Sequence, residues 1–353
     1  MTMFLHGIFA PITTPFYPDG RLYFRKLAQN VEHYSRAPLA GMVVLGSTGE
    51  AILLGDDEKR EVLKCAIEAA SARKVMVAGT GAESALETLR LTEYAAGLGY
   101  DAAMVRTPHY YKRQMQPENM LAFYRFVADR SPVPIIIYNF PQCTGYDIPV
   151  DVVAALAEHP NLAGIKESSG NVEKVAELVA RTKHIAREAT VTERFEAVTG
   201  RMLKETAPKE AAELVTLGAG AAKPSSAAVE VHGALRTRKK QVGFQVLVGT
   251  AQKLKSLLDL GAVGGILAFS CCAPTACFEI YAALKDNDAP LAEEKQKRIA
   301  RAVERVVGEM GIGALKYAMD LNGYVGGHPR LPLLPLTLEQ KQEVERLMEN
   351  VRN

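Results

Sequence analysis

Apolar residues along the chain gather in short runs that longer amphipathic stretches separate. The runs are apolar on both faces, as the strands of a parallel sheet are when helices cover them. The expected strands span residues 7–11, 42–46, 75–79, 102–106, 134–138, 162–166, 244–248 and 263–269. Helix-length amphipathic segments lie between them, at 56–72, 84–98, 116–130 and 149–158 among others. This alternation predicts an α/β fold, a (β/α)8 TIM barrel over residues 1–285.

One connection is too long for a simple barrel unit. Between the sixth helix and the seventh strand the chain has about 50 extra residues, at roughly 185–240, including the small-residue run 218–222. Helix-to-strand connections lie on the N-terminal face of a barrel, opposite the loops that build active sites. We therefore expect this insertion away from its own active site, as an oligomer contact, a regulatory element or a helical excursion.

The last part of the chain, residues 286–353, is expected to form a helical appendage. Three amphipathic segments, 291–310, 312–322 and 337–351, have the length and periodicity of helices. Thr337 stands where the last helix would begin, and its side chain is suited to cap that end.

Charge and composition narrow the class of protein. The 353 residues are 48% hydrophobic and carry 42 Lys plus Arg against 40 Asp plus Glu, which is typical of a globular protein without a dominant charge. The basic run 236–240 is expected to be a solvated helix end, so no nucleic-acid partner is expected. Five cysteines, sparse and mostly in apolar sequence, favour a reduced cytoplasmic setting.

No membrane partner is expected either. The first residues lack the basic and long apolar regions of a signal peptide. Residues 260–278 carry no charge over 19 positions, but their glycines and Pro274 favour a buried strand that runs into a turn and a helix.

Lys166 is the main candidate for chemistry. It ends the apolar run Leu-Ala-Gly-Ile-Lys, so its amine should lie in the mouth of the barrel, where active sites form. An ordinary lysine is neutral in only about one molecule in 2,500 at pH 7, and desolvation raises that fraction. A neutral amine can attack a ketone to form a Schiff base. The alternative is a structural lysine whose amine pairs with Glu167 or Glu50.

Hydroxyl groups end the neighbouring strands. Tyr138 could move a proton next to the Schiff base, with Ser47 and Tyr111 as a relay, although aromatic residues at a barrel rim often only pack. The segment 46–49, Gly-Ser-Thr-Gly, could hold a carboxylate through its hydroxyls and backbone N–H groups, or could be only a tight turn.

Other motifs are weak. The segment 79–84 has Ser where a dinucleotide fingerprint needs its third glycine, and the seven histidines have no zinc-ligand spacing. Cys271, Cys272 and Cys277 are expected to form a small-residue core patch. These observations disfavour a metal-dependent aldolase.

Five motifs in the same order resemble the dihydrodipicolinate synthase and N-acetylneuraminate lyase family. They are GSTGE at 46–50, GTG at 79–81, TPHYY at 107–111, YNFP at 138–141 and GIKESSG at 164–170. Further segments, among them DAAMVRTPHYY and GIGALKYAMDLNGYVGG, are most similar to the 4-hydroxy-2-oxoglutarate aldolases of that family.

The resemblance implies a class I lyase that acts on a small 2-oxo acid without a metal or organic cofactor and assembles as a dimer or tetramer. It implies Lys166 as the Schiff-base residue, Tyr138 as acid and base, Ser47 as relay, and Tyr111 as a relay supplied by a neighbouring subunit. Substrate-binding roles fall to Thr48 and the Ser47 backbone for the pyruvate carboxylate, Ser168 for a distal carboxylate, and the backbones of Gly249 and Ile266.

Three positions depart from the family pattern. Cys143 stands where the synthases usually carry an Arg that holds acidic groups, Thr48 stands in place of Asn, and Glu167 in place of Asp. Cys143 counts against the synthase reaction, whereas Thr48 and Glu167 depart from the aldolase pattern. From the aldolase-like segments and Cys143 we expect cleavage of 4-hydroxy-2-oxoglutarate to pyruvate and glyoxylate. The alternatives are dihydrodipicolinate synthase, a 2-keto-3-deoxy sugar acid aldolase, and a non-enzymatic barrel that binds pyruvate as a sensor or scaffold.

Overall fold

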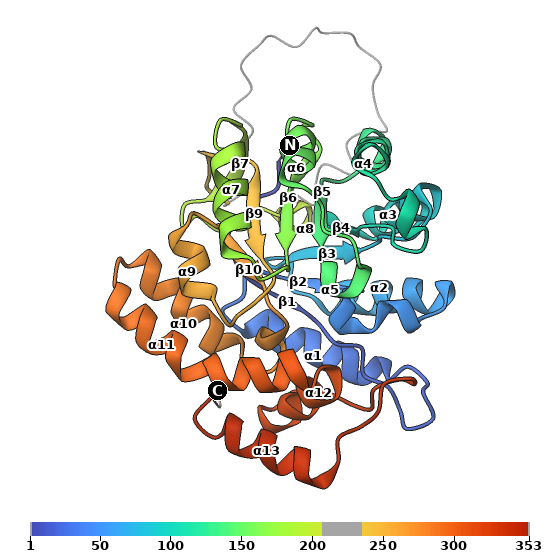
Figure 1. Ribbon diagram of the computed structural model, residues 1–353, viewed down its shortest axis with the longest axis vertical. Coiled ribbons are helices and arrows are strands. Elements are labelled where there is room, and N and C mark those ends of the chain that lie inside the picture. The colour runs from blue at the N-terminus through green and yellow to red at the C-terminus, as the bar shows by residue number, and fades with distance from the viewer. Residues whose placement is uncertain (1, 207–234, 352–353) are drawn as a thin grey trace, which may run out of the picture.

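Eight parallel strands close into a barrel, as the hydrophobic pattern predicts (Figure 1). The computed structural model describes residues 2–206 and 235–351. Neighbouring strands follow chain order around the barrel until β10 closes on β1. The barrel strands are β1 (Gly7–Pro11), β2 (Gly41–Val44), β3 (Val75–Gly79), β4 (Ala102–Arg106), β5 (Ile135–Asn139), β6 (Leu162–Glu167), β9 (Gln245–Val248) and β10 (Gly264–Ile266). The expected (β/α)8 class is therefore confirmed.

Helices surround the barrel and bury one face against it. The short helix α5 (Pro141–Thr144) follows β5 at the barrel mouth. The surrounding helices are α1 (Phe24–Arg36), α2 (Asp56–Ala69), α3 (Ala85–Leu98), α4 (Pro117–Arg130), α6 (Val150–Ala157), α7 (Val172–Thr182), α9 (Leu254–Asp259) and α10 (Pro274–Lys285). Their buried positions, for example Leu27, Val31 and Tyr34 on α1, recur at helical spacing and form one core with the outward-facing strand residues.

The barrel interior is a second, separate core. Alternate residues of each strand point inward, so Ala102 and Met104 of β4 lie in the interior cluster while Ala103 and Val105 lie in the outer one. The inward position that follows Met104 on β4 is Arg106, and on β5 Tyr138 follows Ile136. Arg106 and Tyr138 therefore lie at the carboxyl ends of their strands, next to the apolar core of the barrel interior.

The C-terminal residues form a helical layer against α9 and α10, and the loop after residue 321 contacts α1 (Figure 1). It consists of α11 (Ala289–Ala302), which continues as a π-helical turn over 303–309, then α12 (Ile312–Leu321) and α13 (Leu338–Met348). The Thr337 hydroxyl accepts a hydrogen bond from the Gln340 N–H, as the sequence predicts for the cap of the last helix. Asn322 donates to the Cys272 carbonyl and joins this layer to the barrel.

The described part of the insertion contains a two-stranded antiparallel sheet. Its strands are β7 (Glu188–Thr192) and β8 (Thr237–Gln241), and α8 (Gly200–Thr206) follows β7. The expectation of a helix end for the basic run 236–240 is wrong, since most of that run lies in β8. The strand forms because β8 pairs with the β-branched residues of β7, and Lys239 donates to the Thr190 hydroxyl across the pair. The run 218–222 lies outside the described residues.

Contacts of this segment are with the N-terminal side of the barrel. The Thr199 hydroxyl donates to the Ala72 carbonyl at 2.5 Å, and the Gly200 N–H donates to Asp101. Ala72 lies three residues before β3 and Asp101 directly precedes β4, so these contacts lie at the end opposite the strand-to-helix loops. These contacts place Thr199 and Gly200 of the insertion at the end of the barrel opposite its mouth.

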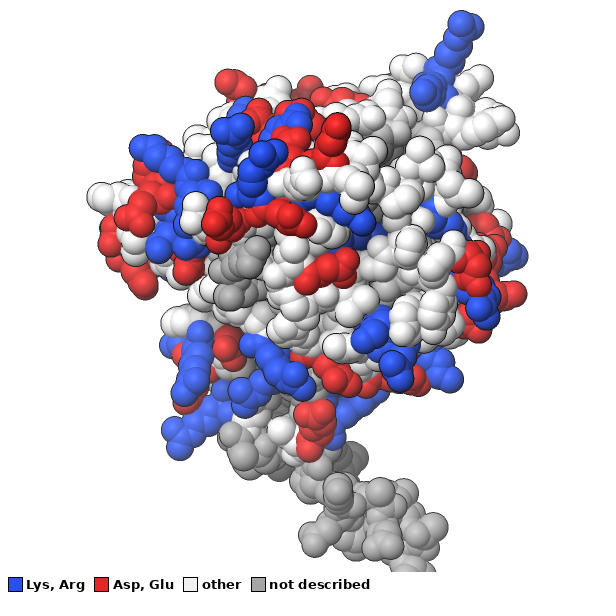
Figure 2. Space-filling model, turned by 90° about the horizontal axis from the view of Figure 1, so that it is seen from below, with Lys and Arg blue, Asp and Glu red and all other residues white. Residues whose placement is uncertain are grey.

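Within the described residues, no helix has both the length and the apolar character needed to cross a bilayer. On the face seen in Figure 2, groups of Lys and Arg side chains lie beside Asp and Glu, and wide uncharged areas separate these groups.

Candidate active site

Lys166 lies inside the mouth of the barrel. It is paired in register with Tyr138 on β5 and with Leu247 on β9, and it is only 4% exposed. Its Nζ stands 4.1 Å from the centre of the Tyr138 ring. The strand therefore holds the amine in a nearly water-free position beside a phenol.

The alternative of a structurally paired lysine is wrong for Lys166. Glu50 pairs with Lys316 at 2.5 Å, and Glu167 accepts hydrogen bonds from Asn139 and lies 3.4 Å from Lys174. No carboxylate within the described residues forms an ion pair with Lys166. Both candidate partners are held by other cations or amides, which leaves the amine unpaired.

Burial without a counter-ion changes the protonation of this amine. Burial lowers the pKa of Lys166 to about 7, and the Cys271 and Cys143 thiols act in the opposite direction. About half of the molecules then carry a neutral, nucleophilic amine near pH 7.

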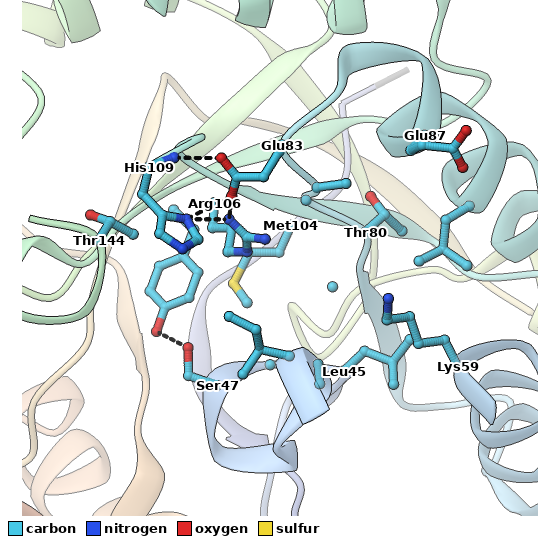
Figure 3. Close-up of a pocket in the computed structure, with 18 of the residues that line it drawn as sticks. Leu45, Ser47, Lys59, Thr80, Glu83, Glu87, Met104, Arg106, His109 and Thr144 are labelled. Atoms are coloured by element: carbon cyan, nitrogen blue, oxygen red, sulfur yellow. Dashed lines mark hydrogen bonds and ion pairs between the residues drawn. The ribbon is translucent and has the colours of Figure 1, made fainter. Parts of the chain in front are cut away.

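Tyr138 and Ser47 meet above Lys166, as the sequence predicts for a proton relay. The Ser47 Oγ lies 3.3 Å from the Tyr138 hydroxyl, and Ser47 is exposed at the barrel mouth (Figure 3). Burial raises the pKa of the Tyr138 phenol, although the hydrogen bond with the Ser47 hydroxyl lowers it in part. The phenol is therefore an acid in its resting form, and it needs a nearby positive charge before it can act as a base.

The loop that carries Ser47 and Thr48 has an unusual backbone. Residues 47–49 form a tight 3₁₀ turn between two non-glycine residues with positive φ, Leu45 at 62° and Glu50 at 55°. The carbonyl of Leu45 approaches Gly79 so closely that a Cβ there would lie 2.2 Å from its oxygen. The glycine at 79 therefore makes room for the loop rather than belonging to a dinucleotide fingerprint.

A buried ion pair between Glu50 and Lys316 holds this loop in place. Glu50 and Lys316 are 2% and 1% exposed, and the Lys316 Nζ also donates to the carbonyls of Thr14 and His328. The second carboxylate oxygen of Glu50 accepts from the Arg330 N–H at 2.7 Å. The C-terminal layer is thus joined directly to the turn that bears Ser47 and Thr48.

Ser168 and Gly249 lie together at the ends of β6 and β9. The Ser168 Oγ is buried and has no hydrogen-bond partner within the described residues. A Cβ at Gly249 would lie 1.8 Å from that oxygen, so only glycine fits there. Ile266 is buried in the barrel interior and pairs with Phe9 of β1. The arrangement leaves one buried hydroxyl available to a ligand.

Tyr111 stands apart from these residues within the single chain. Its side chain is 63% exposed, and its ring contacts Tyr110 edge to face at 5.2 Å. Among the described residues of the chain, the Ser47 and Tyr138 hydroxyls therefore meet without Tyr111.

A cavity of about 400 Å³ extends from Ser47 and Tyr138 towards β3 and β4 (Figure 3). Its wall includes a charged cluster that the sequence analysis missed: Arg106, Glu83 and His109. Arg106 donates to Glu83 at 2.9 Å and lies 2.8 Å from the His109 Nδ1. The signal available in the sequence was the inward position of Arg106, two residues beyond Met104 on the same strand.

Two expectations about cysteine and histidine can be compared with the structure. Cys271, Cys272 and Cys277 are fully buried among apolar residues, which confirms the predicted core patch. No group of three potential metal ligands occurs among residues 2–206 and 235–351.

Comparison with known families identifies the barrel. The family model described as "Dihydrodipicolinate synthetase family" matches residues 4–188 and 198–351. The chain belongs to this family. The match spans the barrel mouth and the C-terminal layer, and the gap of nine positions, 189–197, lies at the start of the insertion. The family predicted from the five motifs is confirmed.

Relatives within the family align along nearly the whole chain. A 4-hydroxy-tetrahydrodipicolinate synthase from Exiguobacterium sp. is 27% identical over 343 residues, covering 97% of each chain. One from Methanothrix thermoacetophila is 30% identical over 342 residues, covering 97% of this chain and 95% of the relative. The solved dihydrodipicolinate synthase from Acinetobacter baumannii, complexed with pyruvate, is 26% identical with a TM-score of 0.77 and covers 99% of each chain. The chain is accordingly an enzyme of the lysine Schiff-base lyase class that characterises the dihydrodipicolinate synthetase family.

Proposed function

We propose that Lys166 forms a Schiff base with pyruvate or a longer 2-oxo acid, and that the enzyme makes or breaks the carbon–carbon bond next to it. The observation that carries the proposal is the buried amine. Lys166 is 4% exposed, has no carboxylate partner among the described residues, and has a pKa lowered by burial to about 7. A Schiff-base lysine needs a neutral amine in a dry pocket, and both conditions are met.

The chemistry follows from the protonation of the two neighbouring groups. The neutral amine attacks the ketone carbon, and the Tyr138 phenol, whose pKa burial raises, protonates the departing hydroxyl so that water leaves. The resulting iminium carries a positive charge close to the Tyr138 ring, where Nζ lies at 4.1 Å, and this charge stabilises the phenolate. The phenolate is then a competent base.

In the cleavage direction, that base removes the proton of the C4 hydroxyl, with Ser47 as relay at 3.3 Å from the phenol oxygen. The C3–C4 bond breaks, its electron pair moves into the iminium to give an enamine, and an aldehyde leaves. The enamine is protonated at C3, and water hydrolyses the imine to release pyruvate. The Ser47–Thr48 turn binds the pyruvate carboxylate, and Ser168, with its unpartnered Oγ, meets polar groups further along the substrate.

Two reactions of this kind compete as the physiological one. The names of the relatives favour condensation of pyruvate with aspartate semialdehyde, the 4-hydroxy-tetrahydrodipicolinate synthase reaction. Cleavage of 4-hydroxy-2-oxoglutarate is the second candidate, and the neutral thiol of Cys143 in the cavity wall, where the resemblance led us to expect an Arg, favours it.

A direct assay separates these candidates. Purified protein is given pyruvate with aspartate semialdehyde in one reaction and 4-hydroxy-2-oxoglutarate in another, with the Lys166→Met variant as control. Higher kcat/KM for aspartate semialdehyde assigns the synthase reaction, and higher kcat/KM for 4-hydroxy-2-oxoglutarate assigns the aldolase reaction. Turnover that survives in Lys166→Met would contradict the Schiff-base mechanism itself.

A further inference from the structure

Arg106 is a cationic side chain on β4, next to the strand that carries Tyr138. It is paired in register with Tyr138 on the neighbouring strand, as Lys166 is on the other side. Lys166, Tyr138 and Arg106 thus form one row across β6, β5 and β4. The alternation of β4 directs Arg106 inward, and it lines the same cavity as Ser47 and Tyr138.

One side of the Arg106 guanidinium is already occupied. Its Nη1 donates to Glu83 at 2.9 Å and to the Thr107 carbonyl at 3.3 Å, and lies 2.8 Å from the His109 Nδ1. Among the described residues, Nε and Nη2 have no hydrogen-bond partner. These two atoms form the edge that binds a carboxylate through two parallel hydrogen bonds.

The local structure holds this side chain in place. Glu83 accepts from the backbone N–H groups of His109 and Tyr110 at 2.8 and 3.0 Å, which joins the β3 loop to the β4 loop (Figure 3). A Cβ at Gly81 would lie 2.9 Å from the Arg106 Cγ, so the glycine leaves room for the arginine stem. Arg106 is therefore oriented before any ligand arrives.

Other cations of the cavity wall are engaged elsewhere. Lys59 pairs with Asp56 and Arg90 with Glu87, in each case on its own helix. Arg60 lies over the Tyr94 ring. Since Glu83 balances one positive charge, attraction at Arg106 depends on directed hydrogen bonds from Nε and Nη2 rather than on a net charge.

We propose that Arg106 binds the carboxylate of the aldehyde half of the substrate, so that the aldehyde that combines with pyruvate is an acidic one. This inference rests on the proposed function of Lys166. Neighbouring strands lie about 4.8 Å apart, so the backbones of Lys166 and Arg106 are separated by roughly 10 Å. A Lys side chain, a short dicarboxylate chain and an Arg side chain together are long enough to span that separation.

The test compares acidic aldehydes with neutral counterparts in the addition to pyruvate. Glyoxylate is paired with glycolaldehyde, and aspartate semialdehyde with its methyl ester. The wild-type protein should favour the acidic member of at least one pair by more than tenfold in kcat/KM. Arg106→Met should lower kcat/KM for that acid by about 10- to 100-fold, mainly through KM, and leave the neutral member within about twofold.

Three controls keep the inference separable from the proposed function. Trapping of pyruvate on Lys166 by borohydride reports the Schiff base alone and should be unchanged in Arg106→Met. Arg106→Lys keeps the positive charge but loses the two parallel N–H donors of the guanidinium, so it should recover only part of the preference for the acidic aldehyde. Arg90→Met removes a cation from the same wall and should keep the wild-type preference.

The outcomes are distinct. A wild-type protein that does not trap pyruvate overturns the proposed function, and the inference with it. A protein that traps pyruvate but shows no acid preference overturns the inference alone, as does an Arg106→Met variant that loses acidic and neutral turnover equally or loses trapping.

Discussion

The chemistry of the barrel mouth depends on the state of one side chain, Lys166. Its strand position was predictable, because an apolar run that ends in Lys at a barrel mouth directs the amine inward. That Lys166 has no ion-pair partner could not be predicted. Glu167 is its neighbour in the sequence and Glu50 lies in another of the five motifs, but the tertiary fold pairs these carboxylates with Lys174 and Lys316. Arg106 was missed for a similar reason. Its capacity to bind a carboxylate depends on which guanidinium nitrogens lack a hydrogen-bond partner among the described residues, and the tertiary fold decides that.

The lowered pKa of Lys166 predicts a pH dependence for Schiff-base formation. The folded pKa is about 7 against an ordinary value of 10.5, so the reactive neutral form is abundant above pH 7 and falls as the pH drops below it. The second-order rate of pyruvate trapping should rise about tenfold per pH unit between pH 5 and 6 and level off near pH 8. A rate that still rises steeply above pH 9 would contradict this account, and an exposed lysine in a small peptide is the control.

At the scale of elements, the link between α12 and the turn after β2 is the main structural feature. Lys316 and Glu50 are both almost fully buried, and each satisfies backbone groups as well as the other's charge. The hydrophobic pattern predicted α12 and the barrel strands well, because burial of one helix face or both strand faces dominates those sequences. It could not predict which polar residues pair across 266 positions, nor that the basic residues of β8 would pair with β7 in a two-stranded antiparallel sheet.

Removing one partner of this pair should destabilise the protein strongly. Lys316→Met leaves the Glu50 carboxylate buried and unpaired, which costs about 3–5 kcal/mol of the free energy of unfolding. The double variant Glu50→Gln, Lys316→Met should recover much of that loss. Urea unfolding followed by circular dichroism measures both. Lys255→Met, which breaks the exposed pair with Asp259, is the matched control and should cost about 0–1 kcal/mol. Equal losses in Lys255→Met and Lys316→Met would refute a special role for the buried pair.

At the scale of the whole molecule, the exposed Tyr111 is the feature that a single chain does not explain. It projects from the loop after β4 with 63% exposure, while the relay of its own chain is formed by Ser47 and Tyr138. We propose that Tyr111 completes the relay of a neighbouring subunit, so that the active form is at least a dimer. The described insertion residues contact the N-terminal end, which leaves the loops at the barrel mouth accessible for such an exchange.

Mixing two inactive variants tests this exchange. Lys166→Met and Tyr111→Phe proteins should each have low activity, and subunit exchange between them should restore about a quarter of the wild-type activity, because half of the dimers are mixed and each has one intact site. Sedimentation should show an oligomer under the assay conditions. An active monomer, or a mixture no more active than its parts, would remove Tyr111 from the mechanism.

The central claim is that the Lys166 amine bonds covalently to a 2-oxo acid, and borohydride reduction in the presence of pyruvate tests it most directly. Peptide mass spectrometry of the wild-type protein should find the mass of one reduced pyruvate on the peptide that contains Lys166, and no such adduct in Lys166→Met. An unmodified Lys166 peptide, or an adduct on another lysine that persists in Lys166→Met, would contradict the account.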